Sequence, residues 1–388
     1  MIHMLARRKQ PSPHYRRWST ERCVIRRADR FKCGQLSFAD FSRFFVVNKN
    51  TRPGRNMRKV VGSTMTSVIH DGQPPLTGWG LMGLIMCITS LCVIGLFWGT
   101  VRSMTDVWSS SRTFAHGFLV LPATGYLIWF YRHLWMQLKP APSVWGVAAL
   151  ILPGSGWFVG HVTDVMWLQQ AAVVAMLPGL MWAILGKEIV KTLAWPLGFL
   201  VFMLPVGTSI EPWLQDFTAW FIQVGLQLTN IPYHYEDYRI VLTTGTWEVA
   251  PDCGGLRYLL PGLALGYAFA TLIYRQPARR LVFLALCAVV LMVANGIRAY
   301  GVIVGDHFGI ADGTDHRVFS YTIYGLTMPL LFWLGLRWQE NMTVTSFQHR
   351  TLDVRRGLDT RKTIFMAFAA LAVLAVAPLS VWLWLDRL

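Results

Sequence analysis

Three residues of types that carry out covalent chemistry lie far apart in this sequence: Cys253, Arg298 and His316. A cysteine attacks as its thiolate, and a neighbouring base or positive charge favours that form. Histidine is the natural proton acceptor because its ordinary pKa lies near neutrality. Arginine keeps its charge and offers a rigid fork of donors to a developing oxyanion or to a carboxylate. If the fold brings the three to one side of a membrane, they indicate a membrane cysteine peptidase or transpeptidase.

The sequence around the cysteine favours a reactive position over a buried one. Cys253 lies between loop-forming residues and a Gly-Gly pair, at the start of a long apolar run. Asn295 precedes Arg298 by three residues, so the two share a helix face. Each candidate also has a plainer interpretation. The cysteine could be inert, the arginine could reach for lipid headgroups, and the histidine could be a loop residue with His307 as its competitor.

Other polar residues near the same runs are candidates for binding a substrate. Arg257, one turn beyond the cysteine, could pair with a substrate acid or with a lipid phosphate. His116 stands at the end of another apolar run, where it is either structural or close to the substrate. Together with Asn295 these form the predicted substrate-binding set, and Glu248 or Asp252 could orient a base.

The composition is typical of a membrane protein. Hydrophobic residues make up 54% of the chain and charged residues 14%, and the mean hydropathy is +0.40. Several apolar runs reach the roughly 20 residues that cross a bilayer core of about 30 Å, which excludes a soluble globule. The six cysteines show no CxxC pair and no metal-ligand spacing, so neither a disulfide framework nor a metal site is predicted. No glycine-rich phosphate-binding motif is present, so no nucleotide or other cofactor is expected.

Apolar runs and basic loops together predict an all-α polytopic membrane protein. We expect about eight or nine transmembrane helices with a short periplasmic hairpin and an interfacial helix. The basic loops fall on alternate sides without exception, and the positive-inside rule assigns them to the cytoplasm. The three candidate catalytic residues then all lie on the outer side. The nine predicted spans are residues 78–100, 115–131, 144–161, 165–185, 190–206, 255–273, 280–302, 319–337 and 364–385.

The segment between the fifth and sixth runs is predicted to lie at the outer surface. Residues 210–228 have apolar side chains at helical spacing, interrupted by polar ones, as is typical of an interfacial helix. A true span there would reverse every later loop and break the charge rule. Residues 238–250 alternate like a short hairpin turning at Gly245, which would carry Cys253 to the membrane surface.

The N-terminal part carries most of the net charge of +16. Residues 1–70 hold 16 Lys and Arg against three acids. Such a tail could touch anionic lipid or nucleic acid, but we favour a disordered cytoplasmic extension, or a true start at Met57 or Met65, and expect no nucleic-acid partner. No secretory cleavage site precedes the first run, so that run is expected to remain as an anchor. The predicted divisions are the basic extension at 1–75, a membrane catalytic domain at 76–340, and a cytoplasmic loop with a final transmembrane helix at 341–388.

Three separated stretches, in the same order, resemble the exosortase family of bacterial membrane enzymes, most closely its A-type members. Two shorter stretches agree with it, and the similarity extends over residues 79–340. The main stretches are Trp247-Glu-Val-Ala with Cys253-Gly-Gly-Leu-Arg257-Tyr-Leu, Asn295-Gly-Ile-Arg298-Ala-Tyr-Gly301, and Asp315-His316 before an aromatic-rich run; the shorter ones are Ala115-His-Gly-Phe-Leu-Val120 and Leu214-Gln-Asp-Phe-Thr218.

The resemblance implies an enzyme of the Gram-negative inner membrane whose active site faces the periplasm. It implies cleavage of exported proteins at a C-terminal sorting signal, made of a Pro-Glu-Pro motif, a membrane helix and a basic cluster. It also implies a link to exopolysaccharide production. The family's catalytic cysteine, arginine and histidine correspond to Cys253, Arg298 and His316. Signal-bearing proteins and membrane lipids are therefore the expected partners.

Two positions beside the cysteine depart from the family pattern. Gly254 stands where serine is common, and Asp252 stands where a small residue such as alanine is common. Both leave the nucleophile intact and leave the subfamily open. The alternative function is a polytopic exopolysaccharide polymerase or export subunit, which would not need Cys253. Tolerance of Cys253→Ser separates the two.

Overall fold

The predicted all-α polytopic membrane class is confirmed by a computed structural model that describes residues 76–309, 315–339 and 359–385. Within these ranges seven helices are long and apolar enough to cross a membrane. An eighth span is added if a helix pair bent by 74° is counted as one. The predicted run at 115–131 forms a shorter apolar helix, Gly117–Phe130.

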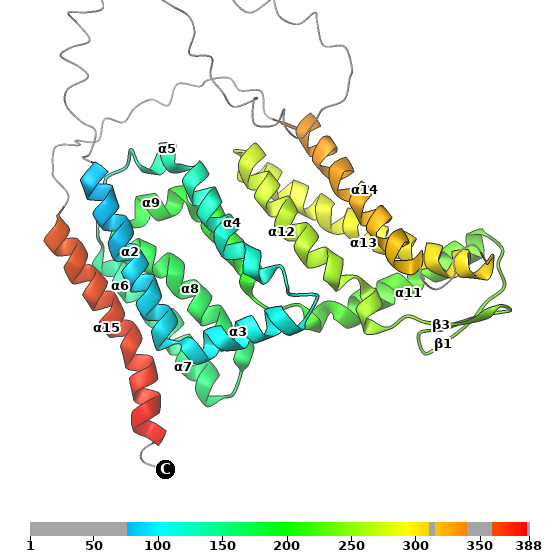
Figure 1. The fold of residues 1–388 in the computed structure, drawn as a ribbon, viewed down its shortest axis with the longest axis horizontal. Coiled ribbons are helices and arrows are strands. Elements are labelled where there is room, and N and C mark those ends of the chain that lie inside the picture. Colours follow the sequence, from blue (N-terminus) through cyan, green and yellow to red (C-terminus); the bar gives the residue numbers. More distant parts are fainter. Residues whose placement is uncertain (1–75, 310–314, 340–358, 386–388) are drawn as a thin grey trace, which may run out of the picture. The chain divides into compact units, whose positions relative to one another are not determined.

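The described elements follow one another along the chain as in Figure 1. The N-terminal half contains α2 (Leu76–Leu96), α3 (Trp98–Ser110), α4 (Gly117–Phe130), α5 (Arg132–Trp135), α6 (Val144–Ala149), α7 (Ile151–Val162), α8 (Met166–Leu185), α9 (Lys187–Thr192), α10 (Ala194–Gly198) and the 3-10 helix η3 (Phe199–Met203). After η4 (Thr208–Ile210) come α11 (Glu211–Leu228), β1 (His234–Glu236), β2 (Arg239–Leu242), β3 (Gly245–Glu248), η5 (Pro251–Gly254), α12 (Leu256–Ile273), α13 (Pro277–His307), α14 (Asp315–Arg337) and α15 (Thr360–Leu385).

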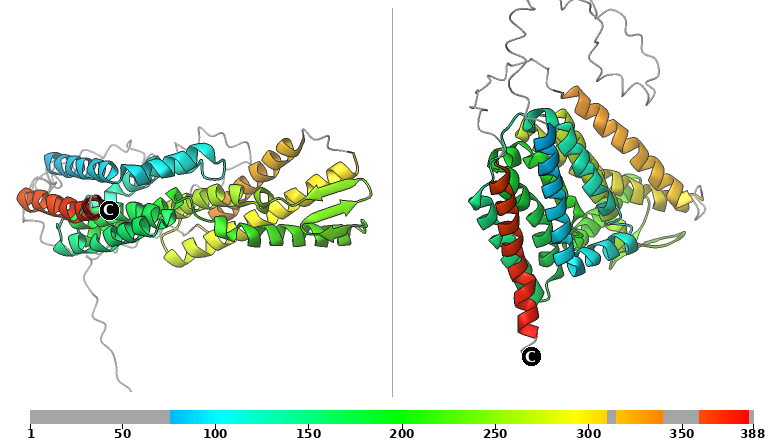
Figure 2. Two further views of the ribbon diagram at one scale, coloured as in Figure 1. Left: turned by 90° about the horizontal axis from the view of Figure 1, so that it is seen from below. Right: turned by 60° about the vertical axis from the view of Figure 1, so that its left-hand side comes forward.

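One bundle is formed by α2, α6, α7, α8 and α15 around a shared apolar core. The first and last described helices pack against each other in it, far from the sheet (Figure 2). Large buried side chains fill it, among them Phe97, Leu150, Trp157, Met176 and Leu374. Burying such side chains contributes roughly 1.5–3 kcal/mol each in water, whereas close packing is the main gain in lipid.

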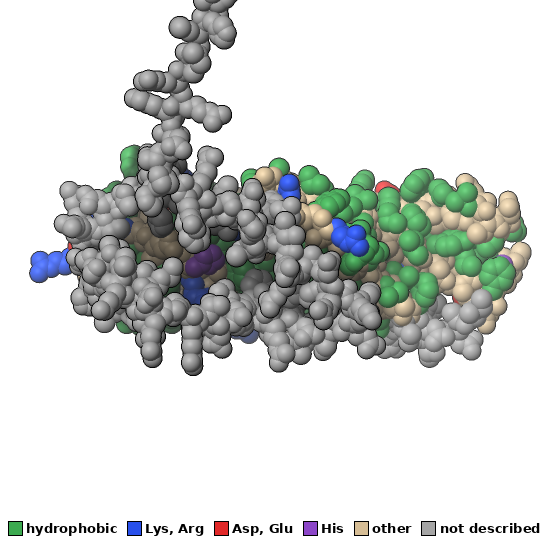
Figure 3. Space-filling model, turned by 90° about the horizontal axis from the view of Figure 1, so that it is seen from above, with side chains coloured by type: hydrophobic (Ala, Val, Ile, Leu, Met, Phe, Trp, Pro, Cys, Tyr) green, Lys and Arg blue, Asp and Glu red, His purple; other side chains and the backbone are tan. Residues whose placement is uncertain are grey.

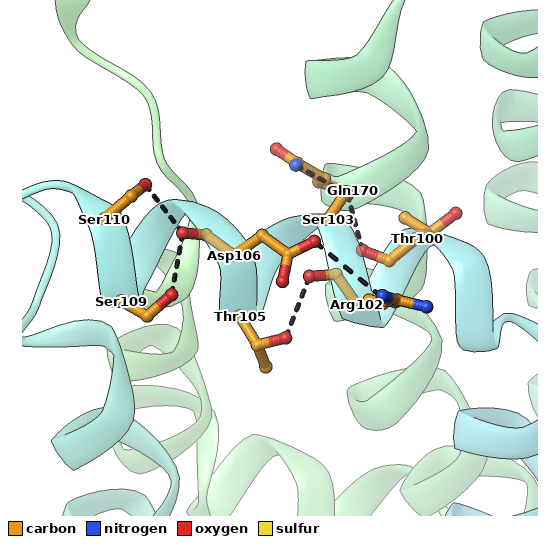
Figure 4. A network of polar contacts seen from close by, with 8 residues as sticks. All are labelled: Thr100, Arg102, Ser103, Thr105, Asp106, Ser109, Ser110 and Gln170. Carbon is orange, nitrogen blue, oxygen red and sulfur yellow. Dashed lines mark hydrogen bonds and ion pairs between the residues drawn. The ribbon is translucent and has the colours of Figure 1, made fainter.

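Helix α3 is amphipathic and connects to α8 through polar side chains (Figure 4). Gln170 Nε2 donates to Ser103 Oγ at 3.1 Å, and Ser103 Oγ donates to the Thr100 carbonyl at 2.7 Å. Arg102 and Asp106 form an exposed ion pair at 3.9 Å on the other side. Buried polar groups need partners, so this network holds α3 against the bundle.

The second bundle consists of α12, α13 and α14, with α11 and the sheet beside it. A bend of 74° separates the α10–η3 segment from α11, which runs across one end of the helices (Figure 1). A helix is therefore present where one was predicted over 210–228, and its position at the membrane surface stays a prediction. Strands β1, β2 and β3 form an antiparallel sheet in that order. The hairpin turn was predicted at Gly245, but Gly245 already pairs with Leu242 in the β2–β3 ladder. The turn therefore consists of residues 243–244.

Basic side chains gather at one end of the described helices. The connections α4–α6, α8–α10 and α12–α13, the end of α14 and the start of α15 all lie at this end (Figure 1). Figure 3 shows Lys, Arg and His side chains on it and few acidic ones. Helix α3, α11, the sheet and η5 lie at the opposite end. The predicted alternation of basic loops is thus present, and the assignment of their side to the cytoplasm stays a prediction. All four described lysines belong to the basic end: Lys139, Lys187, Lys191 and Lys362.

At this basic end, Arg280 is buried at the start of α13, with 5% of its surface exposed. Its Nε donates to the Tyr274 carbonyl at 2.8 Å, and its Nη2 donates to the Tyr131 hydroxyl at 3.1 Å. Its guanidinium carbon lies 4.8 Å from the centre of a Trp195 ring. The arginine therefore ties α13 to the ends of α4 and α12 and to α10.

Candidate active site

Cys253 lies in a short 3-10 turn between the sheet and α12. η5 follows β3 after two residues, and the Cys253 amide donates to the Ala250 carbonyl at 2.8 Å. The cysteine is half-buried and is not in a disulfide. Its side chain contacts the apolar cluster that joins the sheet to α11 and α13. The thiol is therefore held at the end of the bundle opposite to the basic loops.

Of the Gly-Gly pair after the cysteine, Gly255 is required by the local geometry and Gly254 is closely packed. Gly255 has a φ of +92°, a left-handed backbone that strongly favours glycine. A Cβ on it would also lie 2.6 Å from Cγ of Asn295, far inside van der Waals contact. Gly254 lies against α11, where a Cβ would be 3.1 Å from the Gln215 amide nitrogen. The turn thus presses the Cys253 main chain onto both α11 and α13.

The side chain of Asn295 connects the cysteine segment to the arginine. Its Nδ2 donates to the Cys253 carbonyl at 2.9 Å. Its Oδ1 accepts from Nη1 of Arg298 at 3.1 Å and from the Tyr324 hydroxyl at 3.0 Å. Nδ2 also donates to Oγ1 of Thr218 at 3.1 Å. One carboxamide therefore joins η5, α11, α13 and α14.

Arg298 is half-buried and held from two sides. Its Nε donates to Oγ of Ser320 at 2.9 Å, in addition to the Nη1 bond to Asn295. Its guanidinium carbon lies 5.7 Å from the centre of the Tyr258 ring, which stacks on Tyr324 with centroids 3.8 Å apart. These bonds use the Nε and Nη1 donors, and within the described part of the chain no hydrogen bond from Nη2 is found, so that this nitrogen can serve a further acceptor. An oxyanion or a carboxylate is the chemical class that such a nitrogen binds best.

His316 lies in the first turn of α14, where the sequence led us to expect a loop residue. The helix already begins at Asp315, one residue before the histidine. Position 316 precedes Ser320 by four residues, so the two positions lie on the same face of α14. Because Ser320 bonds Arg298, the backbone brings position 316 to within one helical turn of the arginine's contact with α14.

The competing histidine is engaged elsewhere. Nδ1 of His307 lies 2.7 Å from Oγ1 of Thr244, at the tip of the hairpin. Next to it, Nε1 of Trp247 donates to Asp306 at 2.9 Å. These contacts attach the β2–β3 hairpin to the end of α13. Glu248 was a candidate for orienting the base. It is exposed on β3 opposite Arg239 in the ladder, and it has no contact with a histidine among the described residues.

The other predicted substrate-binding residues are distributed unevenly around this cluster. Arg257 lies in the first turn of α12, half-buried, four residues after Cys253. His116 precedes α4, with Nδ1 3.1 Å from the Thr113 carbonyl, and no described contact joins it to Cys253, Asn295 or Arg298. Burial lowers the pKa of His116, and the Thr113 and Phe202 carbonyls partly oppose that shift.

Three residues of this cluster were not among the predicted site residues: Thr218, which appeared only at the end of a family-like stretch, Ser320 and Tyr324. Thr218 lies on the buried face of α11, and its hydroxyl donates to the Leu214 carbonyl at 2.8 Å. Ser320 and Tyr324 follow His316 at four-residue spacing along α14. That spacing was the available signal for the α14 pair. Thr218 gave no comparable signal because threonine in a helix usually bonds its own backbone.

A comparison with protein-family models matches residues 108–333 to the family described as transmembrane exosortase. The match begins near the end of α3 and ends within α14, so it includes η5, Asn295, Arg298 and the start of α14. No curated protein and no solved structure is significantly similar to the chain. The matched region is more than half of the 388 residues. The chain belongs to the transmembrane exosortase family.

Proposed function

We propose that this exosortase cleaves C-terminal sorting signals from exported proteins, with Cys253 as its nucleophile. The observation that carries the proposal is the single Asn295 side chain that bonds both the Cys253 carbonyl and the Arg298 guanidinium. Two sequence motifs separated by more than forty residues are thereby joined through one carboxamide. A chain that used neither residue would have no need for this connection.

The chemistry follows from the types of the three residues. His316 takes the thiol proton of Cys253, and the thiolate attacks the carbonyl carbon of the scissile peptide bond. The oxyanion that forms lies at Nη2 of Arg298, a donor whose charge does not depend on pH. The carbon–nitrogen bond then breaks, and the leaving amine takes the proton from His316. Water or an acceptor amine attacks the thioester, and the thiol is released.

We further propose that the site faces the periplasm from the inner membrane. Support comes from the basic connections, which gather at the end of the helices opposite to η5. The positive-inside rule assigns such an end to the cytoplasm. The expected substrates, exported proteins with a membrane helix followed by a basic cluster, would approach the cysteine from the periplasmic side. The association with exopolysaccharide production is part of the same proposal.

The test is a reporter protein with an N-terminal tag, a Pro-Glu-Pro C-terminal signal and a C-terminal tag, produced with the exosortase. We expect loss of the C-terminal tag with the wild-type chain and none with Cys253→Ala. Cys92→Ala is the matched control, since Cys92 is exposed on α2 and lies outside the matched region. His316→Gln should reduce the processing rate by about 10²–10⁴-fold, the usual contribution of a general acid–base residue.

The outcomes separate the alternatives. Equal processing by Cys253→Ala and the wild type would rule out the nucleophile. Absence of processing by well-expressed wild type, together with full complementation of exopolysaccharide production by Cys253→Ser, would support a polymerase or export subunit. The mass of the processed reporter distinguishes hydrolysis, which leaves a free C-terminal carboxylate, from transfer, which leaves an amide to the acceptor. A hydroxamate formed with added hydroxylamine would show the thioester intermediate that both routes share.

A further inference from the structure

Asn295 is almost completely enclosed, with 2% of its surface exposed, and every polar valence of its side chain is used. A carboxamide has two N–H donors and an oxygen with two lone pairs. Both donors are occupied by the Cys253 carbonyl and by Thr218, and both lone pairs by Arg298 and Tyr324. No valence remains for a peptide. The role in substrate binding suggested by the sequence therefore does not fit this side chain.

The orientation of the amide is fixed by its neighbours. A backbone carbonyl only accepts hydrogen bonds, so Nδ2 must face Cys253. A guanidinium only donates them, so Oδ1 must face Arg298. Thr218 is equally committed, because its hydroxyl hydrogen goes to the Leu214 carbonyl and its oxygen accepts from Nδ2. Rotation of the amide by 180° would place Nδ2 against the Arg298 guanidinium, which are two donors. It would also place Oδ1 against the Cys253 carbonyl, which are two acceptors.

We infer that Asn295 is a positioning residue, which sets the place of the Cys253 main chain relative to the Arg298 guanidinium. Gly255 reinforces this role, since its bare backbone is what lets η5 approach the amide. This inference deepens the proposed function, and its kcat tests rest on that function because they measure reporter processing. The Asn295 side chain acts through Cys253 and Arg298 and does not touch the substrate.

Asn295→Asp tests the direction of the hydrogen bonds with almost no change in volume. The carboxylate has no donor for the Cys253 carbonyl or for Thr218, and it attracts the Arg298 charge to itself. We expect at least about a 10²-fold loss in kcat with KM changed less than about threefold, because only the geometry at the reacting atoms is altered. A residue that bound the peptide would instead raise KM.

A second variant keeps the test informative if Asn295→Asp fails to fold. Thr218 is fully enclosed, so it cannot reach a peptide, and Thr218→Val removes one acceptor of Nδ2 at nearly constant volume. We expect a loss in kcat of roughly three- to tenfold, the cost of one neutral hydrogen bond. Thr124→Val is the matched control: it is a buried threonine in α4 with the same bond to the carbonyl four residues back, and kcat should not change.

A readout that needs no substrate separates this inference from the proposed function. The alkylation rate of Cys253 by iodoacetamide at one fixed pH, followed at peptide level by mass spectrometry, reports how firmly the η5 main chain is held. Asn295→Asp removes the Nδ2 donor to the Cys253 carbonyl, so this rate should change by at least about threefold, the effect of one hydrogen bond, while that of Cys92 in the same sample stays constant. An unchanged rate together with unchanged kcat would overturn the inference, as would a rise in KM alone. If the wild type processes no reporter, a changed rate still supports the coupling, and an unchanged one removes it.

Discussion

Two arginines on one helix, Arg280 and Arg298, show how differently the two ends of this molecule use the same side chain. They are 18 residues apart on α13, which is about five turns, so they lie on the same face. Arg280 is enclosed at the basic end, bound to a backbone carbonyl, a tyrosine hydroxyl and a tryptophan ring. Arg298 is half-buried at the opposite end, where its Nε and Nη1 bind the side chains of Ser320 and Asn295.

The two arginines differ in the groups that accept their hydrogen bonds and in how exposed their side chains are. A carbonyl such as that of Tyr274 is fixed by the backbone, so Arg280 works as a joint between helices. The acceptors of Arg298 are an amide and a hydroxyl that belong to the cluster around Cys253. A buried polar network of this kind is stable only when each member is satisfied, and it rigidifies what it connects. One arginine thus stabilises the fold, and we expect the other to act on a substrate.

Replacing Arg298 should have the largest effect. With Arg298→Gln, loss of the fixed positive charge should reduce kcat for reporter cleavage by about 10²–10³-fold, as for removal of an oxyanion donor. Arg298→Lys should recover little, because an ammonium cannot span Ser320, Asn295 and the substrate at once. Pulse-chase processing of the tagged reporter measures both. A variant with wild-type turnover would place Arg298 in the same structural class as Arg280.

Replacing Arg280 should lower stability and spare the chemistry. Arg280→Gln removes bonds to Tyr274 and Tyr131 at a buried site, at a cost of about 1–3 kcal/mol in unfolding free energy. Thermal aggregation of the detergent-solubilised protein measures the loss. Turnover per folded molecule should match the wild type, since about five turns of α13 separate Arg280 from Arg298. Reduced turnover at full stability would contradict the division between the two ends.

The sequence predicted these two arginines with unequal success. Arg298 was found because a charged residue in an apolar run, three positions after Asn295, is rare in a membrane helix. Arg280 was only the first residue of the span predicted over 280–302, because hydropathy and the charge rule register a residue's type and not its burial. Its enclosure depends on how α4, α10 and α12 meet around it, which no single stretch of sequence encodes.

The same limit explains what was found and missed elsewhere. The α11 helix and the hairpin were predicted from local periodicity, which the backbone obeys directly. The partnership of Thr218, Tyr324 and Asn295 depends on the registry of three helices, so the sequence left Asn295 among the substrate-binding candidates. Hydropathy predicted a span over residues 115–131, where the structure has the shorter apolar helix α4, because hydropathy measures apolar content and not the residue at which a helix ends.

A matched pair of smaller changes sharpens the comparison at the level of one hydrogen bond. Ser320→Ala removes the acceptor of Arg298 Nε, and Tyr131→Phe removes the acceptor of Arg280 Nη2. Each bond is worth about 0.5–1.5 kcal/mol. We expect both variants to lose a similar small amount of thermal stability, but only Ser320→Ala to lower kcat, by roughly two- to tenfold. A lower kcat in Tyr131→Phe and an unchanged kcat in Ser320→Ala would exchange the roles of the two ends.

The smallest effect is expected on the pH dependence of stability, at His116, one of the two histidines that flank α4. Burial lowers the pKa of His116 below its ordinary value of 6.5, whereas His133 is exposed, with the same kind of contact from Nδ1 to a carbonyl at 3.1 Å. Below pH 6.5 the unfolded chain therefore binds a proton that folded His116 resists, so stability is present above that pH and falls as the pH drops. In His116→Asn this loss should disappear between about pH 7.5 and about pH 5, measured as the unfolding temperature of the solubilised protein. Parallel curves for the wild type and His116→Asn would show that the enclosure of His116 makes no energetic difference.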